Sequence, residues 1–349
     1  MSTRTLVVGG GVLIAMLGCR DYAAPSADPT GTTSAATASP EFAVASNTWV
    51  IRADMPSTER YWMATAAVNN SAGESILYVL GGKTESGDWE GNGGSLSKVQ
   101  AYNVATNTWT TRAPLPMPLY STNGAGVING KIYVSGGVAS YRNHRKELYM
   151  YDPATNTWSR KHDMPLPSWR GVTGVIDGRL YVLPGCAQSD VDECLLQVPL
   201  VFYRYNPATD RWTSLPAPAS RRIDGVAGVI GGKLYVAGGV DGTHASSRVD
   251  VFDPTTNQWT SKASIPEGQF GAAGAVLAGK LYVIGGRTPV FTRVRWNSVY
   301  DPLTDTWTRQ APLPTARAAI AASRVFRNGQ PRIEVVGGTR PGNNLRYIP

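Results

Sequence analysis

The hydrophobic positions of this chain fall in short runs rather than in long periodic stretches. Val, Ile, Tyr and Trp dominate the runs, and Gly, Pro, Asn and Asp separate them, which is the pattern of β-strands joined by turns. No long stretch shows the period of an amphipathic helix. Residues 222–259 show the whole unit: a strand of small residues, a Gly-Gly turn, a strand ending in two glycines, a third strand ending in an aromatic, and a strand that bears Trp259. The pattern predicts an all-β chain.

The same unit recurs along the chain. A tryptophan marks each copy: Trp49, Trp109, Trp158, Trp212, Trp259 and Trp307. An aromatic stands seven residues before each tryptophan: Phe42, Tyr102, Tyr151, Tyr205, Phe252 and Tyr300. A glycine pair recurs at Gly81–Gly82, Gly136–Gly137, Gly238–Gly239, Gly285–Gly286 and Gly337–Gly338. Tandem copies of one supersecondary unit predict a repeat architecture, because a single copy cannot bury its own hydrophobic face.

These spaced glycines, aromatics and tryptophans resemble the kelch repeat, a four-stranded propeller blade of about 50 residues. The resemblance covers residues 42–349 and implies a closed, six-bladed β-propeller with four antiparallel strands in each blade. Inner strands crowd the axis of a propeller, so they should carry small residues, as residues 271–274 do. Trp and Tyr are large enough to fill the wider gaps between blades.

One blade is divided between the two ends of the repeat region. Residues 42–52 carry an aromatic and Trp49 without inner strands, whereas residues 317–338 carry inner strands without a tryptophan. We therefore expect the N- and C-terminal segments to pair and close the ring, which removes exposed strand edges. Tyr347 leaves open which terminus supplies the third strand of this blade.

Residues 1–18 have the features of a signal peptide of the lipoprotein type. Arg4 is followed by an apolar run that is short for a membrane span, and the Leu-Gly-Cys ending resembles a lipoprotein cleavage site with Cys19 as the lipidated residue. Residues 19–41 are rich in Ala, Ser, Thr and Pro and predict a flexible tether. We expect an exported lipoprotein anchored in a membrane by Cys19, in the outer membrane or periplasm if the host has two membranes. The alternative is an ordinary cleaved signal with an incidental cysteine.

The two remaining cysteines, Cys186 and Cys194, bracket one variable loop. Export permits disulfides, so we expect these two to form one. A zinc site would need more soft ligands nearby, and we expect neither a metal nor another cofactor. The formal net charge of +8 is dispersed along the chain, which argues against a nucleic-acid partner. Acidic glycans and envelope proteins remain the candidate partners.

In an antiparallel blade, the loop between the second and third strands and the link into the next blade lie on one face, and the most variable segments are found there. Function usually resides on such loops. Arginines and aromatics at the start of the inner strands and in these loops could bind a carboxylate flanked by an apolar ring. The candidate ligand-binding residues are Arg60, Tyr120, Trp169, Arg170, Arg222, Phe270, Arg317, Trp89, Tyr141 and Arg142. The alternative is that the arginines pair with neighbouring carbonyls or carboxylates of their own blade.

Three functions fit this sequence. The leading interpretation is a non-enzymatic binding or scaffold module for a carbohydrate or protein ligand. The second is a sugar mutarotase or epimerase similar to N-acetylneuraminate epimerase, which would need one acid from the set Glu59, Glu90, Asp163, Asp224 and Glu267. The third is a structural part of an envelope assembly. A copper oxidase of the galactose oxidase type does not fit, because the three histidines have no metal-ligand spacing and the cysteines bracket a loop.

Overall fold

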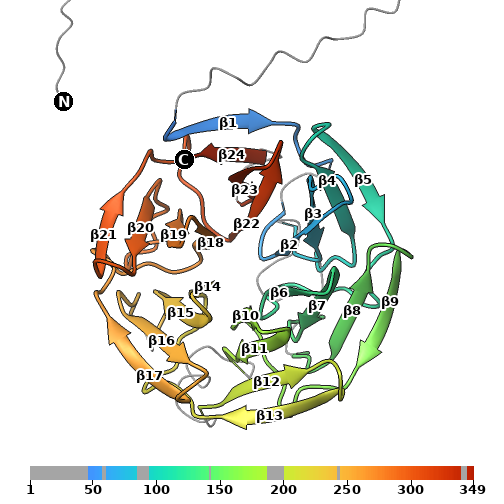
Figure 1. Cartoon of the computed structure of the whole chain (residues 1–349), viewed down its shortest axis with the longest axis horizontal. Helices are drawn as coiled ribbons and strands as arrows, with labels where there is room; N and C mark the ends of the chain where they lie inside the picture. Colours follow the sequence, from blue (N-terminus) through green and yellow to red (C-terminus); the bar gives the residue numbers. More distant parts are fainter. Residues whose placement is uncertain are drawn as a thin grey trace, which may run out of the picture. The chain divides into compact units, whose positions relative to one another are not determined.

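The computed structural model describes residues 46–56, 60–84, 94–140, 143–186, 200–241, 244–338 and 344–349. The described residues all belong to one compact unit, Val44–Pro349. In that unit, six four-stranded antiparallel sheets follow one another around a ring (Figure 1). This confirms the predicted six-bladed propeller. The described residues form no helix, so none is long and apolar enough to cross a membrane.

Five blades take their strands consecutively from the chain, with the first strand at the axis. Blade 1 contains β2 (Ala64–Asn69), β3 (Ser75–Leu80), β4 (Val99–Asn103) and β5 (Thr108–Arg112). Blade 2 contains β6 (Ala125–Ile128), β7 (Lys131–Ser135), β8 (Leu148–Asp152) and β9 (Thr157–Lys161). Blade 3 contains β10 (Val172–Ile176), β11 (Arg179–Leu183), β12 (Phe202–Asn206) and β13 (Arg211–Leu215). Blade 4 contains β14 (Val226–Ile230), β15 (Lys233–Ala237), β16 (Val249–Asp253) and β17 (Gln258–Lys262). Blade 5 contains β18 (Ala273–Leu277), β19 (Lys280–Ile284), β20 (Asn297–Asp301) and β21 (Thr306–Arg309).

Blade 6 closes the ring with strands from both ends of the unit. The C-terminal segment supplies β22 (Ile320–Arg327), β23 (Gln330–Gly337) and β24 (Asn344–Ile348), and the N-terminal segment supplies the outermost strand, β1 (Thr48–Arg52). Trp49 lies opposite Tyr347, as the third-strand aromatic lies opposite the tryptophan in every other blade. The predicted closure is therefore confirmed, and the third strand comes from the C-terminus.

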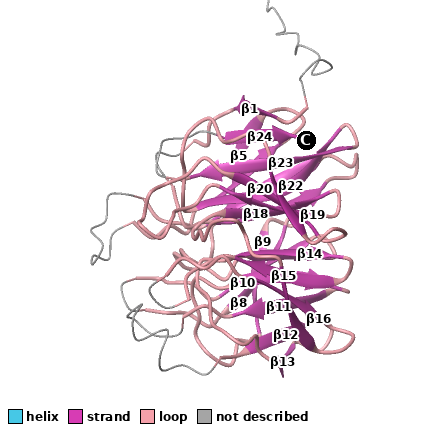
Figure 2. Cartoon of the chain, turned by 90° about the vertical axis from the view of Figure 1, so that its left-hand side faces the viewer, coloured by secondary structure: helices cyan, strands magenta, loops and turns pink. Residues whose placement is uncertain are grey.

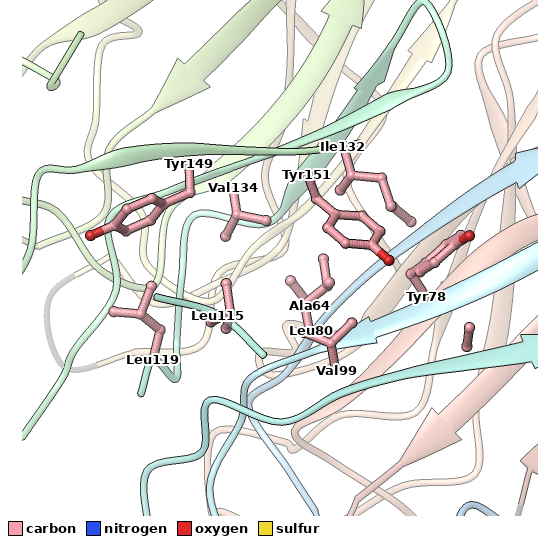
Figure 3. Close-up of a cluster of buried hydrophobic side chains, with 12 residues drawn as sticks. Ala64, Tyr78, Leu80, Val99, Leu115, Leu119, Ile132, Val134, Tyr149 and Tyr151 are labelled. Atoms are coloured by element: carbon pink, nitrogen blue, oxygen red, sulfur yellow. The ribbon is translucent and has the colours of Figure 1, made fainter. Parts of the chain in front are cut away.

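The two aromatic positions of the repeat fill the gaps between blades. The tyrosine of the second strand in one blade contacts the third-strand aromatic of the next, with ring centroids about 6 Å apart. The pairs are Tyr78–Tyr151 at 5.6 Å, Tyr133–Tyr205 at 6.0 Å, Tyr181–Phe252 at 6.1 Å, Tyr235–Tyr300 at 6.0 Å and Tyr282–Tyr347 at 5.7 Å. Figure 3 shows the first of these seams, where Leu80 and Ile132 are buried with the two tyrosines. Near the axis there is no such room: a Cβ on Gly174 would lie 2.6 Å from Leu234 Cδ1 of the next blade.

Glu334 replaces the second-strand tyrosine in blade 6, which adds a polar contact to a seam otherwise packed with apolar residues of blades 6 and 1. Glu334 pairs with Arg346 of the same blade, and both side chains are fully buried. The Arg346 guanidinium also donates to the Val104 carbonyl of blade 1, at 3.2 Å. A buried ion pair therefore joins the last blade to the first.

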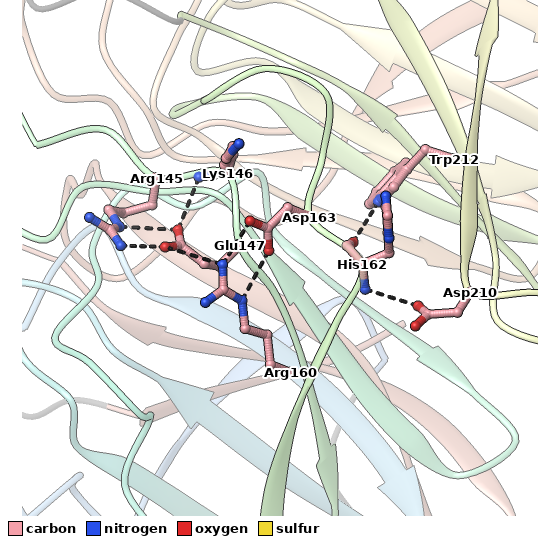
Figure 4. A network of polar contacts seen from close by, with 8 residues as sticks. All are labelled: Arg145, Lys146, Glu147, Arg160, His162, Asp163, Asp210 and Trp212. Carbon is pink, nitrogen blue, oxygen red and sulfur yellow. Dashed lines mark hydrogen bonds and ion pairs between the residues drawn. The ribbon is translucent and has the colours of Figure 1, made fainter.

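Each outer tryptophan also donates a hydrogen bond to the interblade link that precedes its blade. We refer to the hydrogen bonds among this tryptophan, the third-strand aromatic, the Asx residue before the fourth strand and the link as the latch. In blade 3, Trp212 Nε1 donates to the His162 carbonyl at 2.8 Å, and the His162 N–H donates to Asp210 Oδ1 at 2.9 Å (Figure 4). Tyr205 Oη donates to the same Asp210 oxygen at 2.6 Å. Asn107, Asn156, Asp305 and Asn47 take the place of Asp210 in blades 1, 2, 5 and 6. The Asx residue of the turn between the third and fourth strands thus fastens the third strand and the link together.

The connections divide between two faces of the ring. The first-to-second and third-to-fourth strand turns are short and lie on one face, and the second-to-third loops and the interblade links lie on the other (Figure 2). We refer to the second of these as the loop face.

Candidate functional site

Six residues, one from each blade, surround the axis on the loop face where the inner strands begin. All six have left-handed backbone, with φ between 48° and 60°. They are Trp62, Ser121, Arg170, Asp224, Gly271 and Ala319. We refer to this set as the mouth. Left-handed backbone is unfavourable for every member except Gly271, so the surrounding structure must hold it in place.

A closed ring of backbone hydrogen bonds supplies that constraint. The N–H of each mouth residue donates to the carbonyl of the mouth residue in the preceding blade, and Trp62 donates to Ala319, which completes the circle. The six N···O distances lie between 2.8 and 3.1 Å. Each bond crosses a blade boundary, so the ring fixes where six side chains meet while using none of them.

Arg170 is the central side chain of the mouth. Its guanidinium carbon lies 5.0 Å from the ring centroid of Trp62 and 5.1 Å from that of Trp169. His144 stacks on Trp169, with an interplanar angle of 5°. One terminal nitrogen of Arg170 forms an ion pair with Asp224. The Arg170 Nε is buried and has no hydrogen-bond partner among the described residues.

Asp224 is the carboxyl group of the mouth. Burial raises its pKa, and the nearby Arg170 and Arg287 guanidinium groups oppose that rise. Arg287 lies beside the mouth and forms a backbone bridge to Phe270. Burial lowers the pKa of Arg287, and repulsion from Arg293 and Arg170 lowers it further. Two guanidinium groups, those of Arg170 and Arg287, thus act on the one carboxyl group of Asp224, and the local field favours anions.

Tyr120, Trp169, Arg170 and Phe270 are the predicted ligand-binding residues that the structure brings to the mouth or its rim. Lys83 lies 5.5 Å from the Tyr120 ring centroid. Each of the three aromatics immediately precedes a mouth residue in the chain. Trp62 belongs to the same site but was missed in the sequence.

The structure does not bring three of the predicted arginines to the mouth. They lie inside their blades instead: Arg60, Arg222 and Arg317. Their exposed fractions are 1%, 3% and 1%. Arg60 donates to the Gly81 and Lys98 carbonyls, each at 2.6 Å, and burial lowers its pKa to about 9. This is the alternative in which the arginines serve their own blades.

The other two arginines make similar contacts. Arg222 donates to Asp250 Oδ2 at 2.6 Å and to the Arg248 carbonyl at 2.7 Å. Arg317 donates to Thr315 Oγ1 at 3.0 Å. Because the guanidinium group is a rigid fork of donors, it can bind several strand-end groups at once.

Several predicted residues lie outside the described part of the chain. They are the loop residues Trp89, Tyr141 and Arg142, the acids Glu59 and Glu90, the lipidation site Cys19 and the second cysteine Cys194. Cys186 is fully buried and its backbone pairs with Trp169 beside the mouth. The Cys186–Cys194 disulfide stays a prediction.

Two family models match this chain. The model of the Attractin/LZTR1 beta-propeller family matches residues 35–249, more than half of the chain, and the Kelch motif matches residues 270–314. The chain is a kelch-repeat propeller of the Attractin/LZTR1 family. The resemblance inferred from the glycines, aromatics and tryptophans is therefore confirmed.

Among curated relatives, this kelch propeller is 33% identical over 170 residues to Kelch-like protein terF of Aspergillus terreus. That alignment covers 47% of this chain and 36% of the relative. Human Kelch-like protein 25 is 31% identical over 185 residues, covering 52% of this chain and 29% of the relative. The kelch propeller thus matches about a third of the length of these relatives.

A solved structure described as "Structure of YjhT" superposes on the kelch propeller with a TM-score of 0.64. The superposition covers 84% of this chain and 94% of that one, at 17% sequence identity. At this identity the likeness establishes the fold alone.

The six mouth residues and the inner strands together line a central cavity of about 220 Å³. Away from the mouth, its walls are mostly small or hydroxyl-bearing side chains of the inner strands. Thr65 Oγ1 donates to the Ala322 carbonyl at 3.1 Å, and Thr173 Oγ1 donates to the Asn123 carbonyl at 2.8 Å. No group of metal-ligating side chains occurs in the described ranges. The cavity is polar and smaller than the roughly 300 Å³ of a typical ligand pocket, so the chemistry is concentrated at the mouth.

Of the predicted acids in the described part of the kelch propeller, one lies at the mouth. Asp163 forms an ion pair with Arg160 in the seam network between blades 2 and 3 (Figure 4). Glu267 forms an exposed ion pair with Arg309. Asp224 is the one positioned beside an arginine and two tryptophans.

Proposed function

We propose that this kelch propeller is a binding module whose mouth receives a carboxylate-bearing ligand. The observation that carries the proposal is the placement of the Arg170 guanidinium against Trp62 and Trp169, beside the carboxyl group of Asp224. A planar guanidinium edge matches a carboxylate, and indole faces hold the guanidinium plane in position. An acidic protein segment and an acidic sugar both supply this chemistry.

The family supports the protein ligand. Kelch propellers are commonly protein-binding scaffolds, and the relatives matched here are kelch-like proteins. The rigid backbone ring of the mouth fits such a role, because a binding surface that is fixed beforehand loses little conformational freedom when the partner docks.

The test compares the full chain with two variants on a peptide array of graded Asp and Glu content and on an array of sialylated and uronic-acid glycans. Arg170→Lys keeps the charge but removes Nε and the planar fork, so we expect at least about a tenfold weaker affinity for the strongest array ligand. Arg179→Lys is the matched control, because Arg179 is exposed at the start of β11, on the opposite face. Equal affinities of the wild-type chain and the Arg170→Lys variant would exclude the mouth, and the array that responds identifies the ligand class.

A second candidate function rests on Asp224. A carboxyl group with a raised pKa beside an arginine is a candidate general acid–base, and a sugar mutarotase or epimerase needs one at the anomeric hydroxyl. Proton NMR of an anomeric mixture of N-acetylneuraminate tests it. Faster equilibration that is lost in Asp224→Asn supports the enzyme, and an unchanged rate with the wild-type chain excludes it.

The expected export, lipidation and Cys186–Cys194 disulfide belong to the same proposal and rest on the sequence alone. If Cys19 carries lipid, radiolabelled palmitate is incorporated into the wild-type chain and not into Cys19→Ser. Such an anchor would place the binding module at an envelope surface, where an envelope protein or acidic glycan is accessible. The structural envelope role would instead be favoured if the arrays stay silent and an envelope protein co-purifies with the chain.

A further inference from the structure

A turn on the loop face of blade 5 exposes two hydrophobic side chains at its apex. Val290 and Phe291 are 79% and 67% exposed. The other large hydrophobics exposed in the described part of the chain are Ile51 and Leu303, and neither has such a neighbour. We refer to residues 288–292 as the tip.

The tip is an ordered turn. The Phe291 N–H donates to the Thr288 carbonyl at 2.9 Å, and the Thr288 N–H donates to the Thr292 carbonyl at 3.0 Å. The ring of Phe291 touches Phe270 edge-on, with centroids 5.5 Å apart. One edge of the Phe291 side chain is thus supported by the rim of the mouth, and most of the ring faces solvent.

Phe291 is unfavourable at its position for two reasons. Its φ is 62°, a left-handed conformation in which glycine or asparagine is favoured and a bulky side chain is strained. Its exposed ring also gains little from burial within this chain. Strain and exposure at one residue indicate that the side chain serves a contact outside the chain.

Arginines flank the tip on both sides of the chain. Arg287 and Arg293 form a backbone bridge across the base of the turn, and Arg295 follows on the exposed side. Residues 287–295 contain no acidic residue. The apex lies two to three residues beyond the bridge in a closed turn, so it projects less than the roughly 10 Å that three extended residues would span. Apolar groups of interfacial elements reach a depth of about 5–10 Å, with cationic groups at the headgroup level.

We propose that the tip inserts Val290 and Phe291 into an anionic lipid surface, with Arg287 and Arg293 at the level of the phosphates. Two exposed apolar side chains at the apex, with arginines at the base of the turn, match the apolar interior and anionic surface of such a bilayer. The arginines supply charge complementarity, since the cytoplasmic and many envelope leaflets carry anionic headgroups. This inference goes beyond the proposed function and does not depend on it. A single tip gives weak, reversible association, so it would act as a second attachment beside another anchor.

The test is co-sedimentation with vesicles of phosphatidylcholine alone and of phosphatidylcholine and phosphatidylglycerol at 7:3. Every protein is the full chain with Cys19→Ser, so that lipid on residue 19 cannot contribute and the N-terminal segment is common to all. We expect anionic vesicles to bind the parent chain, and Arg293→Gln to weaken that binding by about fivefold, the effect of one charge near the surface. Leu303→Ser is the matched control, because Leu303 is 93% exposed in a turn on the opposite face.

Phe291→Gly gives the sharpest result. Glycine removes the left-handed strain, so the melting temperature should rise, while vesicle binding should fall by at least fivefold. Opposite changes in stability and binding exclude simple misfolding as the cause. Vesicle binding that is equal in the parent, Phe291→Gly and Leu303→Ser chains would overturn insertion, and so would binding that responds to Arg293→Gln alone, which is adsorption by charge. No vesicle binding by the parent chain would overturn the proposal and favour a protein partner for the tip.

Discussion

The latch in blade 4 is incomplete, and restoring it should stabilise the ring. In blade 1, Asn107 accepts hydrogen bonds from the Tyr102 hydroxyl at 2.6 Å and from the Ala53 N–H at 2.9 Å. In blade 4 the Asx residue is Asn257, but the tyrosine is Phe252 and the link residue is Pro216. Phenylalanine has no hydroxyl and proline has no N–H, so neither bond can form. The tryptophan contact remains, with Trp259 Nε1 donating to the Pro216 carbonyl at 2.8 Å.

Phe252→Tyr places a hydroxyl where five other blades have one. A net intramolecular hydrogen bond contributes about 1 kcal/mol, so the free energy of unfolding should rise by about 1 kcal/mol. Adding Pro216→Ala gains a second bond of similar size but loses about 0.4–1 kcal/mol of restriction in the unfolded chain. The double variant should therefore gain about 1–2 kcal/mol. At about 2 °C per kcal/mol for a large domain, the melting temperature rises by roughly 2–4 °C.

Differential scanning calorimetry and urea unfolding measure these changes, and Asn257→Gly completes a double-mutant cycle. Glycine keeps the left-handed backbone of residue 257 while removing the acceptor. The coupling between Phe252→Tyr and Asn257→Gly should be about 1 kcal/mol. Phe202→Tyr is the control, because Phe202 is fully buried on β12 and is not the latch position of its blade. If Phe252→Tyr stabilises no more than Phe202→Tyr, or shows no coupling to residue 257, the latch does not hold the seam.

Three further predictions concern closure and charge. Deleting β1 (Thr48–Arg52) exposes β24 and removes the Trp49 contact, so calorimetry should show a loss of at least about 4 kcal/mol; an unchanged melting temperature would mean that three strands suffice. Glu334→Gln leaves the buried Arg346 without its counter-charge and should cost about 3–5 kcal/mol in urea unfolding, whereas an effect below 1 kcal/mol would contradict a role for the pair in the seam. Burial raises the pKa of Asp224 against the pull of Arg170, so its stabilising contribution is complete below the unfolded value of 3.8 and is lost as pH rises through the folded value. The difference in unfolding free energy between wild type and Asp224→Asn should therefore fall with rising pH, and a flat difference would refute the raised pKa.

The propeller was predictable from sequence because each repeated residue has one physical task. The glycine pair ends the second strand with left-handed backbone, the aromatic and tryptophan fill the seams, and the Asx turn latches the link. The division of the closing blade was harder to predict. Phe42 keeps the spacing to Trp49, but the residue opposite Trp49 is Tyr347, far away in sequence. Strand pairing across the termini leaves no trace in local spacing.

The mouth was predicted only in part, because the alignment of the inner strands was off by one or two residues. Arg60, Arg222 and Arg317 belong to a buried column, and the mouth residue stands two positions later in each blade: Trp62, Asp224 and Ala319. Arginine is conspicuous in a sequence, whereas the residue two positions later varies freely in type. The sequence analysis therefore placed the buried arginines at the mouth, because they recur more regularly than the mouth residues do.

The variation of residue type at the six mouth positions has a physical cause. The ring that fixes the mouth is made of N–H and C=O groups, which every residue here provides, so the fold places no demand on the six side chains. At Ser121, Gly271 and Ala319 the side chains are small, and at Trp62, Arg170 and Asp224 they carry an aromatic face and a charge pair. Left-handed backbone costs a non-glycine residue about 1–2 kcal/mol, and glycine would be the cheapest choice at all six positions. The three larger side chains are present despite that cost, and this is the physical reason to seek the ligand of this propeller at Trp62, Arg170 and Asp224.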